Sequence, residues 1–265
     1  MSEPGPAIIC STISVFAKPI DVAFGLIADA GFDGIEIMVT KDPDTQDAQR
    51  IRELSEDHEL PVVAIHAPFL LMTRRVWGVD PVGKIDRALE LARDVNATLV
   101  VVHPPYRWQG AYRRWLDERL PSIAEGPPTV AVENMFPVRV RGRSVGTLHA
   151  HRSLEDLDPF PRVVLDTSHA AVAGLDPVNA IERLGDRLAH VHLSNNAGRG
   201  GDSHLPLDQG VLDVGRFLDE LAACRFQGAV SLEIDLRPQM EDDRALRRIL
   251  VRDRELCAER LGLAA

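Results

Sequence analysis

Three histidines and an aspartate fall in one short stretch, residues 190–204, which reads HVHLSNNAGRGGDSH. His190 and His192 lie on an apolar run that is typical of a buried strand. Asp202 and His204 close the glycine-rich loop that follows. Imidazole and carboxylate groups together serve two kinds of chemistry, proton transfer and the binding of a divalent cation. Both need further groups of the same kind nearby.

Such groups recur at one place in the sequence pattern, at or near the C-terminal end of short apolar runs. They are Glu36, His66, His103, Glu133, Asp166, His192 and Glu233. His169 follows Asp166 closely, and Asp202 and His204 lie on a loop whose glycines let it fold over a site. When thiolates are absent, imidazole and carboxylate are the ligands that Zn²⁺ and Mn²⁺ prefer.

The apolar runs predict eight β-strands. They cover residues 7–12, 34–39, 62–67, 98–103, 129–134, 162–167, 189–194 and 229–234. Several runs are apolar nearly throughout, as expected of parallel strands that are buried on both faces. Amphipathic segments lie between them, and most begin at an aspartate that can cap a helix. The predicted helices cover residues 20–31, 44–58, 80–95, 176–187, 213–225 and 242–261.

Alternating strands and helices predict right-handed βαβ units, and eight such units close most simply into a (β/α)₈ barrel. We therefore expect residues 1–265 to form a single barrel domain. An open doubly wound sheet is the competing fold, but no G-x-G-x-x-G follows the first strand. The longest irregular stretch, roughly 135–152, is expected to be a functional loop.

In a barrel all C-terminal strand ends open at one mouth, so the polar residues listed above should converge there. Gathering so many of these groups without cations would be costly, which favours a metal site. His190 is expected to point away from His192 and to be structural. His58, His149 and His151 are expected to be solvated.

The formal net charge is −10, from 30 basic and 40 acidic residues. This balance disfavours a non-specific nucleic-acid binder, because neutralised phosphates supply most of that affinity. Arginines at 74–75, 107, 113–114 and 139–143 follow predicted strands and are candidates to ring the mouth. The segment RWQGAYRRW (107–115) suits stacking on bases or sugars, the binding of one phosphate, or simply a solvated helix face with core tryptophans.

No apolar run approaches the roughly 20 residues that span a bilayer, and no signal peptide is visible, so we expect a cytoplasmic protein without a membrane segment. The three cysteines are far apart and form no C-x-x-C pair. A disulfide framework or a thiolate zinc site is therefore not expected.

The motifs VENMF, LDTSH, HVHLSN, DSHLPLDQGVLD and SLEID resemble those of the xylose isomerase-like barrels. That superfamily contains sugar and sugar-phosphate isomerases and epimerases together with the endonuclease IV group of DNA-repair enzymes. The resemblance covers nearly the whole chain, from GFDGIEIM to SLEID.

The resemblance implies two site patterns. In tagatose-3-epimerase-like enzymes one divalent metal is held by four residues, here Glu133, Asp166, His192 and Glu233, and the two glutamates act as acid and base. In endonuclease IV-like enzymes nine residues hold three zinc ions, which adds His66, His103, His169, Asp202 and His204. Glu133 would then bridge two ions, and His169, Asp202 and His204 would hold the third.

By this resemblance the protein is expected to be a metal-dependent isomerase or epimerase of sugars or sugar phosphates, working through a metal-stabilised enediolate. The alternatives are a three-zinc AP endonuclease or other phosphoesterase, another metal-dependent lyase or hydrolase, and a non-catalytic metal-binding protein. Barrels of this kind often pair, so a homodimer is compatible with the resemblance. Candidate substrate-binding residues are Glu36, Phe69, Arg107 and Trp108; Phe69 lies in HAPFL (66–70), which resembles a stretch that enters DNA at abasic sites.

Overall fold

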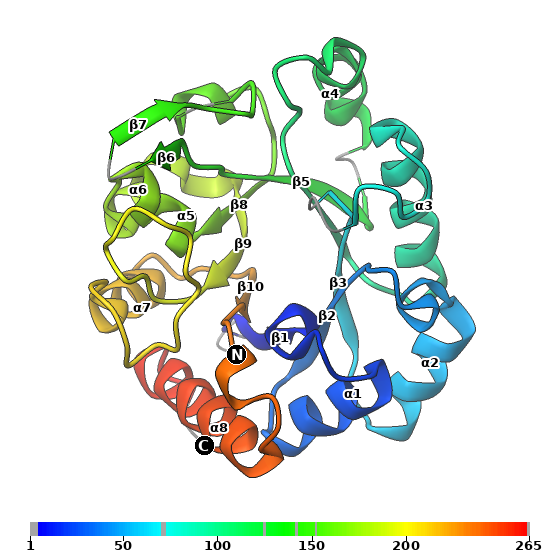
Figure 1. Ribbon diagram of the computed structural model, residues 1–265, viewed down its shortest axis with the longest axis vertical. Coiled ribbons are helices and arrows are strands. Elements are labelled where there is room, and N and C mark those ends of the chain that lie inside the picture. The colour runs from blue at the N-terminus through cyan, green and yellow to red at the C-terminus, as the bar shows by residue number, and fades with distance from the viewer. Residues whose placement is uncertain (1–4, 70–72, 124–125, 141–142, 152, 264–265) are drawn as a thin grey trace.

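Eight parallel strands close into a barrel in the order β1-β10-β9-β8-β5-β4-β3-β2 (Figure 1). The computed structural model describes residues 5–69, 73–123, 126–140, 143–151 and 153–263. The strands are β1 (Ala7–Ser11), β2 (Gly34–Met38), β3 (Val62–His66), β4 (Leu99–Val102), β5 (Thr129–Glu133), β8 (Val163–Asp166), β9 (Leu188–Leu193) and β10 (Ala229–Leu232). The predicted barrel and its eight strands are confirmed.

Alternate residues along each strand face opposite sides, and this separates an outer core from the barrel interior. Outward side chains such as Val100 and Val130 join the large core beneath the helices. A second, smaller apolar cluster consists of Ala64, Leu99, Val101, Ala131 and Val164. Four of these residues lie two positions before His66, His103, Glu133 and Asp166, so they form the layer directly below those polar groups.

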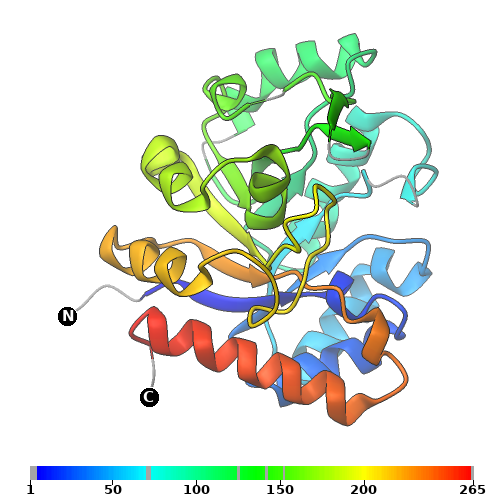
Figure 2. The same cartoon turned by 60° about the vertical axis from the view of Figure 1, so that its left-hand side comes forward.

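The helices pack around the barrel (Figures 1 and 2). They are α1 (Ile20–Asp29), α2 (Ala48–Asp57), α3 (Pro81–Asp94), α4 (Gly110–Ile123), α5 (Thr167–Ala173), α6 (Pro177–Leu184), α7 (Val214–Ala223) and α8 (Asp243–Arg260). The expected aspartate caps are present at Asp80, Asp176, Asp213 and Asp242, whose side chains accept hydrogen bonds from backbone amides of the first turn. Helix α2 begins later than predicted and is capped by Asp47 in place of Asp44. Short 3₁₀ turns cover Thr12–Val15, Pro43–Gln46, Glu155–Leu157, Gly185–Arg187 and Arg237–Gln239.

Helix α4, a hairpin and helix α5 are not among the predicted strands and helices. The stretch predicted as an irregular loop contains an antiparallel hairpin, β6 (Val138–Val140) and β7 (Arg143–Gly146). The short helix α5 begins directly after β8, because the Asp166 side chain accepts a hydrogen bond from the His169 amide and caps it. No helix in the described part of the chain is long and apolar enough to cross a membrane.

The structure describes some of the arginines predicted for the mouth. Arg113 and Arg114 are exposed on α4, and Trp115 packs partly against the core, which is the helix-face interpretation of that segment. Leu70 and the side chains of the arginines at 139–143 lie outside the described residues.

Candidate metal centre

The nine predicted ligands lie together at the C-terminal ends of the strands. Strand ends supply His66, His103, Glu133, Asp166, His192 and Glu233; α5 supplies His169; and the loop after β9 supplies Asp202 and His204. Three sets of ligand atoms from these residues each fall within 4.8 Å of one another: His66, Glu133 and His192; Asp166, His169 and His204; and Asp166, His192 and Glu233. The sets share members, so the ligands form one continuous cluster.

His192 stands at the centre of this cluster. Its Nδ1 lies 3.0 Å from Glu233 Oε2, 3.3 Å from Glu133 Oε1 and 4.0 Å from Asp166 Oδ2. The side chains of His192 and Asp166 are wholly buried, and that of Glu233 is 13% exposed. Glu233 is therefore the member of this group that is open to a substrate at the mouth.

Three carboxylate oxygens of the cluster are buried without a hydrogen-bond donor: Glu133 Oε2, Asp166 Oδ2 and Glu233 Oε2. Burying each such oxygen costs desolvation free energy that no hydrogen bond from the described residues compensates. Each lies near imidazole nitrogens, so divalent cations held in this cluster would satisfy them. The donor set of carboxylate oxygens and imidazole nitrogens thus fits Zn²⁺ or Mn²⁺.

On the other side of Glu133 lie two more histidines. Glu133 Oε2 is 3.1 Å from His103 Nε2 and 3.5 Å from His66 Nε2. His66 Nδ1 lies 3.0 Å from the Ala67 carbonyl oxygen, which only accepts, so Nδ1 carries the proton. The lone pair of His66 Nε2 is then free to face Glu133, in the arrangement common to histidine ligands of metals.

A third group gathers around α5. Because Asp166 Oδ1 caps this helix, Asp166 Oδ2 is left facing His169 and His204, each with Nδ1 at 3.9 Å. Asp202 Oδ2 lies 2.9 Å from His204 Nε2 and 3.3 Å from His169 Nε2. The sequence did not single out Ser168, whose hydroxyl donates to Asp202 Oδ1 at 2.7 Å and so fixes the carboxylate. Its position between two candidate ligands in DTSH was the only available signal.

The loop that carries Asp202 and His204 is held by asparagines (Figure 2, yellow). The Asn195 side chain donates to the Leu207 carbonyl and accepts from the Leu212 amide. The Asn196 amide donates to the Ser168 hydroxyl and to the Gly201 carbonyl. These bonds give a glycine-rich loop a defined shape, so it presents its two ligands from a fixed position.

The two candidate catalytic glutamates have opposite electrostatic environments. Burial opposes the charge of Glu133, but the imidazoles of His192, His103 and His169 hold its pKa well below the usual range. Burial raises the pKa of Glu233. Two carboxyl groups whose pKa values are driven apart suit separate roles in proton transfer.

The histidines of the third group carry positive charge in the absence of a cation. Burial opposes protonation of His204, yet Asp166 and Asp202 raise its pKa to about 10. Burial likewise opposes protonation of His169, whose pKa these aspartates and Glu133 raise well above the usual value. Metal binding would therefore release protons from these rings.

One expectation about the strand residues was wrong. His190 does not point away from His192, because residues two positions apart on a strand share a face. Both Nε2 atoms bond one carboxylate, that of Glu36, at 2.8 Å from His190 and 3.1 Å from His192. Glu36 is 0% exposed and lies inside the barrel below the mouth.

The other candidate substrate residues lie on one side of the cluster. Phe69 packs against His103, with ring centroids 6.3 Å apart, and lines a groove of about 500 Å³ together with Trp108. Trp108 is 70% exposed and stacks on Tyr106. Arg107 is exposed on the same loop.

The expectation for the loop histidines was wrong in one clear case. His149 is buried beneath Tyr106, with ring centroids 4.6 Å apart, and its Nδ1–H donates to the Pro104 carbonyl. His58 and His151 are half-buried.

Comparison with known families matches residues 24–250 to the xylose isomerase-like TIM barrel family. An uncharacterized protein of Mycobacterium tuberculosis is 34% identical over 251 residues, which covers 88% of this chain and 90% of that protein. An uncharacterized protein of Mycobacterium leprae is 34% identical over 244 residues, covering 84% and 87% respectively.

Several solved structures share the fold. A D-tagatose 3-epimerase-like protein is 22% identical with a TM-score of 0.72, and the match covers 97% of each chain. A 3-keto-D-glucoside 4-epimerase from E. coli is 19% identical with a TM-score of 0.69, covering 94% of this chain and 99% of that one. An AP endonuclease, family 2 from Brucella melitensis is 22% identical with a TM-score of 0.65, covering 91% and 97%.

Proposed function

The chain belongs to the xylose isomerase-like TIM barrel family, and from its site we propose a divalent-metal-dependent isomerase or epimerase of sugars or sugar phosphates. The observation that carries the proposal is the central group, in which Glu133 and Glu233 approach His192 Nδ1 from different strands and leave buried carboxylate oxygens unpaired. The similarity in fold to sugar epimerases supports the same reaction class.

In this proposal Glu133, Asp166, His192 and Glu233 hold one ion, which stabilises negative charge on adjacent oxygens of the substrate. The glutamates move the proton of the carbon next to the carbonyl. Glu133 is ionised and suits the base, whereas Glu233 has a raised pKa and suits the acid. Phe69, Arg107 and Trp108 would contact the substrate beside them.

A second candidate is a three-zinc phosphoesterase, such as an AP endonuclease. The favouring observation is that five further ligands join the central four, which suits clustered ions that activate water and neutralise a leaving oxygen. The net charge of −10 weighs against a duplex DNA substrate.

The glutamate assignment is tested by Glu233→Gln. We expect the proton-transfer rate to fall by ~10²–10⁴-fold, because the variant keeps the size of the side chain but cannot take or give the proton. The measurement is deuterium uptake from D₂O into a panel of ketoses and ketose phosphates, with circular dichroism to verify the fold. Asp235→Asn, a partly exposed carboxylate two residues on that pairs with Arg237, is the control. Wild-type rates in Glu233→Gln would contradict the assignment.

The number of ions separates the two candidates. Elemental mass spectrometry would be applied to protein purified without chelators or nickel resin. About one ion per chain agrees with the isomerase proposal, and about three zinc ions per chain with the phosphoesterase. In the second case abasic-site DNA and phosphoesters would be assayed before any sugar.

A further inference from the structure

Inside the barrel, the residue layer directly below the candidate ligands is apolar on four strands but polar on β9. On β3, β4, β5 and β8 the residue two positions below the candidate ligand is alanine or valine. On β9 the corresponding residue, below His192, is His190, and Glu36 of β2 lies between the two rings. The three side chains are at most 1% exposed. A buried polar triad here costs desolvation, so packing alone does not account for it.

We propose that Glu36, held in place by His190, positions His192 so that its Nδ1 lone pair faces the metal centre. Glu36 is wholly buried and contacts the two imidazoles, so it acts through His192 as a positioning residue. This inference goes beyond the proposed reaction, because it concerns the binding of the ion and holds for one ion or three.

Hydrogen-bond chemistry supports the assignment. A carboxylate without a proton only accepts, and each Glu36 oxygen lies within hydrogen-bond distance of an imidazole Nε2, at 2.8 Å from His190 and 3.1 Å from His192. Nε2 of His192 must then carry a proton and donate to Glu36 Oε1. That leaves Nδ1 as the ligand nitrogen, directed at Glu133, Asp166 and Glu233. A carboxylate behind a histidine ligand fixes both its tautomer and its orientation.

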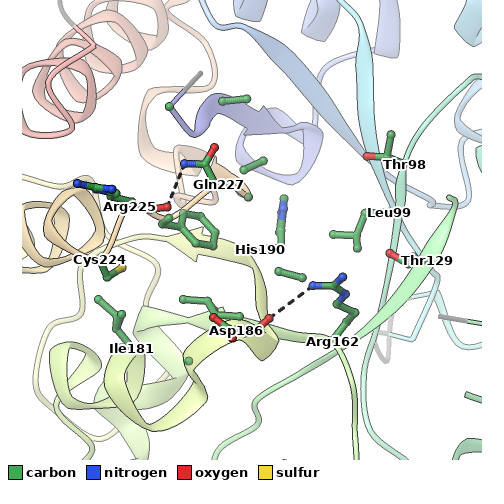
Figure 3. Close-up of a pocket in the computed structure, with 18 of the residues that line it drawn as sticks. Thr98, Leu99, Thr129, Arg162, Ile181, Asp186, His190, Cys224, Arg225 and Gln227 are labelled. Carbon is green, nitrogen blue, oxygen red and sulfur yellow. Dashed lines mark hydrogen bonds between the residues drawn. The ribbon is translucent and has the colours of Figure 1, made fainter. Parts of the chain in front are cut away.

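His190 holds the second oxygen of Glu36. Its Nε2–H donates to Glu36 Oε2, so both carboxylate oxygens are fixed. Figure 3 shows His190 among the residues that line a cavity of about 880 Å³, with Thr98, Leu99 and Thr129 at the starts of their strands. His190 therefore stands between Glu36 and this cavity at the opposite end of the barrel from the ligands.

The test is the affinity for Mn²⁺ alone, measured by calorimetry on the whole chain. Loss of such a supporting partner typically weakens metal binding ~10–100-fold. We expect Glu36→Ala to weaken Mn²⁺ binding by ~100-fold and Glu36→Gln by ~10-fold, because glutamine keeps a hydrogen-bond acceptor but not the charge. For His190, Gln keeps a donor and should bind more tightly than Phe, which has none. Asp253→Asn, a buried carboxylate on α8 that accepts from the Leu207 amide, is the control.

A spectroscopic measurement separates positioning from simple destabilisation. In ¹⁵N-labelled, zinc-loaded wild type the Nε2–H proton of His192 should exchange slowly with solvent and give a visible signal. That signal should be lost in Glu36→Ala and kept in Asp253→Asn. Affinity within about twofold of wild type in Glu36→Ala, or in Glu36→Gln should the alanine variant not fold, overturns the proposal. Equal affinity in His190→Phe and wild type overturns the part assigned to His190. Neither readout depends on turnover, so a failed sugar assay leaves the test intact.

Discussion

Glu133 contacts more of the cluster than any other carboxylate in the described site. Its two oxygens lie within 3.5 Å of His66, His103, His169 and His192. A residue with this many imidazole neighbours belongs to the centre in both site schemes. His66, in contrast, belongs only to the scheme with several ions, so the two residues allow the schemes to be told apart.

If one ion works in catalysis, His66→Ala should keep activity within ~10-fold of wild type, whereas Glu133→Ala should lose ~10³-fold or more, because it removes a ligand and a proton carrier together. Steady-state rates and metal content measured on the same preparations check this. Equal and complete loss in both variants, with metal depleted in both, would instead favour a polynuclear site.

His149 predicts a pH dependence of stability. Burial lowers its pKa from 6.5 to about 4, so the unfolded state binds more protons than the folded state between these values. The contribution of neutral His149 is present above pH 6.5 and about 3 kcal/mol of it is lost as the pH falls to 4. The difference in free energy of unfolding, wild type minus His149→Phe, should therefore decrease as the pH falls from 6.5 to 4. A difference that stays constant with pH would disprove the assignment.

At the scale of elements, hydrogen bonds give the glycine-rich loop after β9 a defined shape, so the loop holds the candidate ligands Asp202 and His204 in place. Its last glycine, Gly210, has φ of +123°, and an added Cβ would lie 2.5 Å from both Asn195 Oδ1 and the Asn196 carbonyl oxygen. Asn195 is the residue that ties the loop together, so this glycine is needed for close approach and not only for its backbone angle.

Gly210→Ala should destabilise the protein by ~2–4 kcal/mol and weaken binding at the Asp202 and His204 end of the cluster, because Asn195 must move. Urea unfolding and metal stoichiometry measure the two effects. Gly201→Ala, in the same loop with no atom within 4 Å of the added Cβ, is the matched control and should behave as wild type. Identical metal content and stability in both variants would show that the loop does not position ligands.

At the scale of the molecule, the site exists only when the barrel is closed. Its candidate ligands come from residues 66 to 233: β10 pairs with β9 and so brings Glu233 beside His192, and His66 of β3 reaches His192 only across the closed barrel. An ion held by these groups therefore binds the folded state and not the unfolded chain.

Metal removal should accordingly lower thermal stability. At a free ion concentration of 100 Kd the ion contributes about 2.7 kcal/mol, which corresponds to about 5–10 °C in Tm for a chain of this size. Calorimetric scans before and after chelation, with Zn²⁺ or Mn²⁺ added back, measure the shift. A double Glu133→Gln, Glu233→Gln variant should show almost none. Equal shifts in that variant and wild type would place the stabilising ion elsewhere.

The barrel and the ring of candidate ligands at its mouth follow from the sequence alone. Apolar runs separated by capped helices specify parallel strands, and a polar residue at the end of each run must reach the common mouth. Asp166, His192 and Glu233 could be placed in this way without coordinates, because strand-end geometry is local and repeats with each βαβ unit.

The contacts beneath and beside that ring depend on the tertiary structure. The joint bonding of Glu36 by His190 and His192, the hold of Ser168 on Asp202, and the burial of His149 all join residues distant in sequence. Such contacts depend on barrel register and loop path, which no local pattern encodes. The sequence places the candidate metal ligands at the mouth, and the closed fold supplies the partners that orient their side chains.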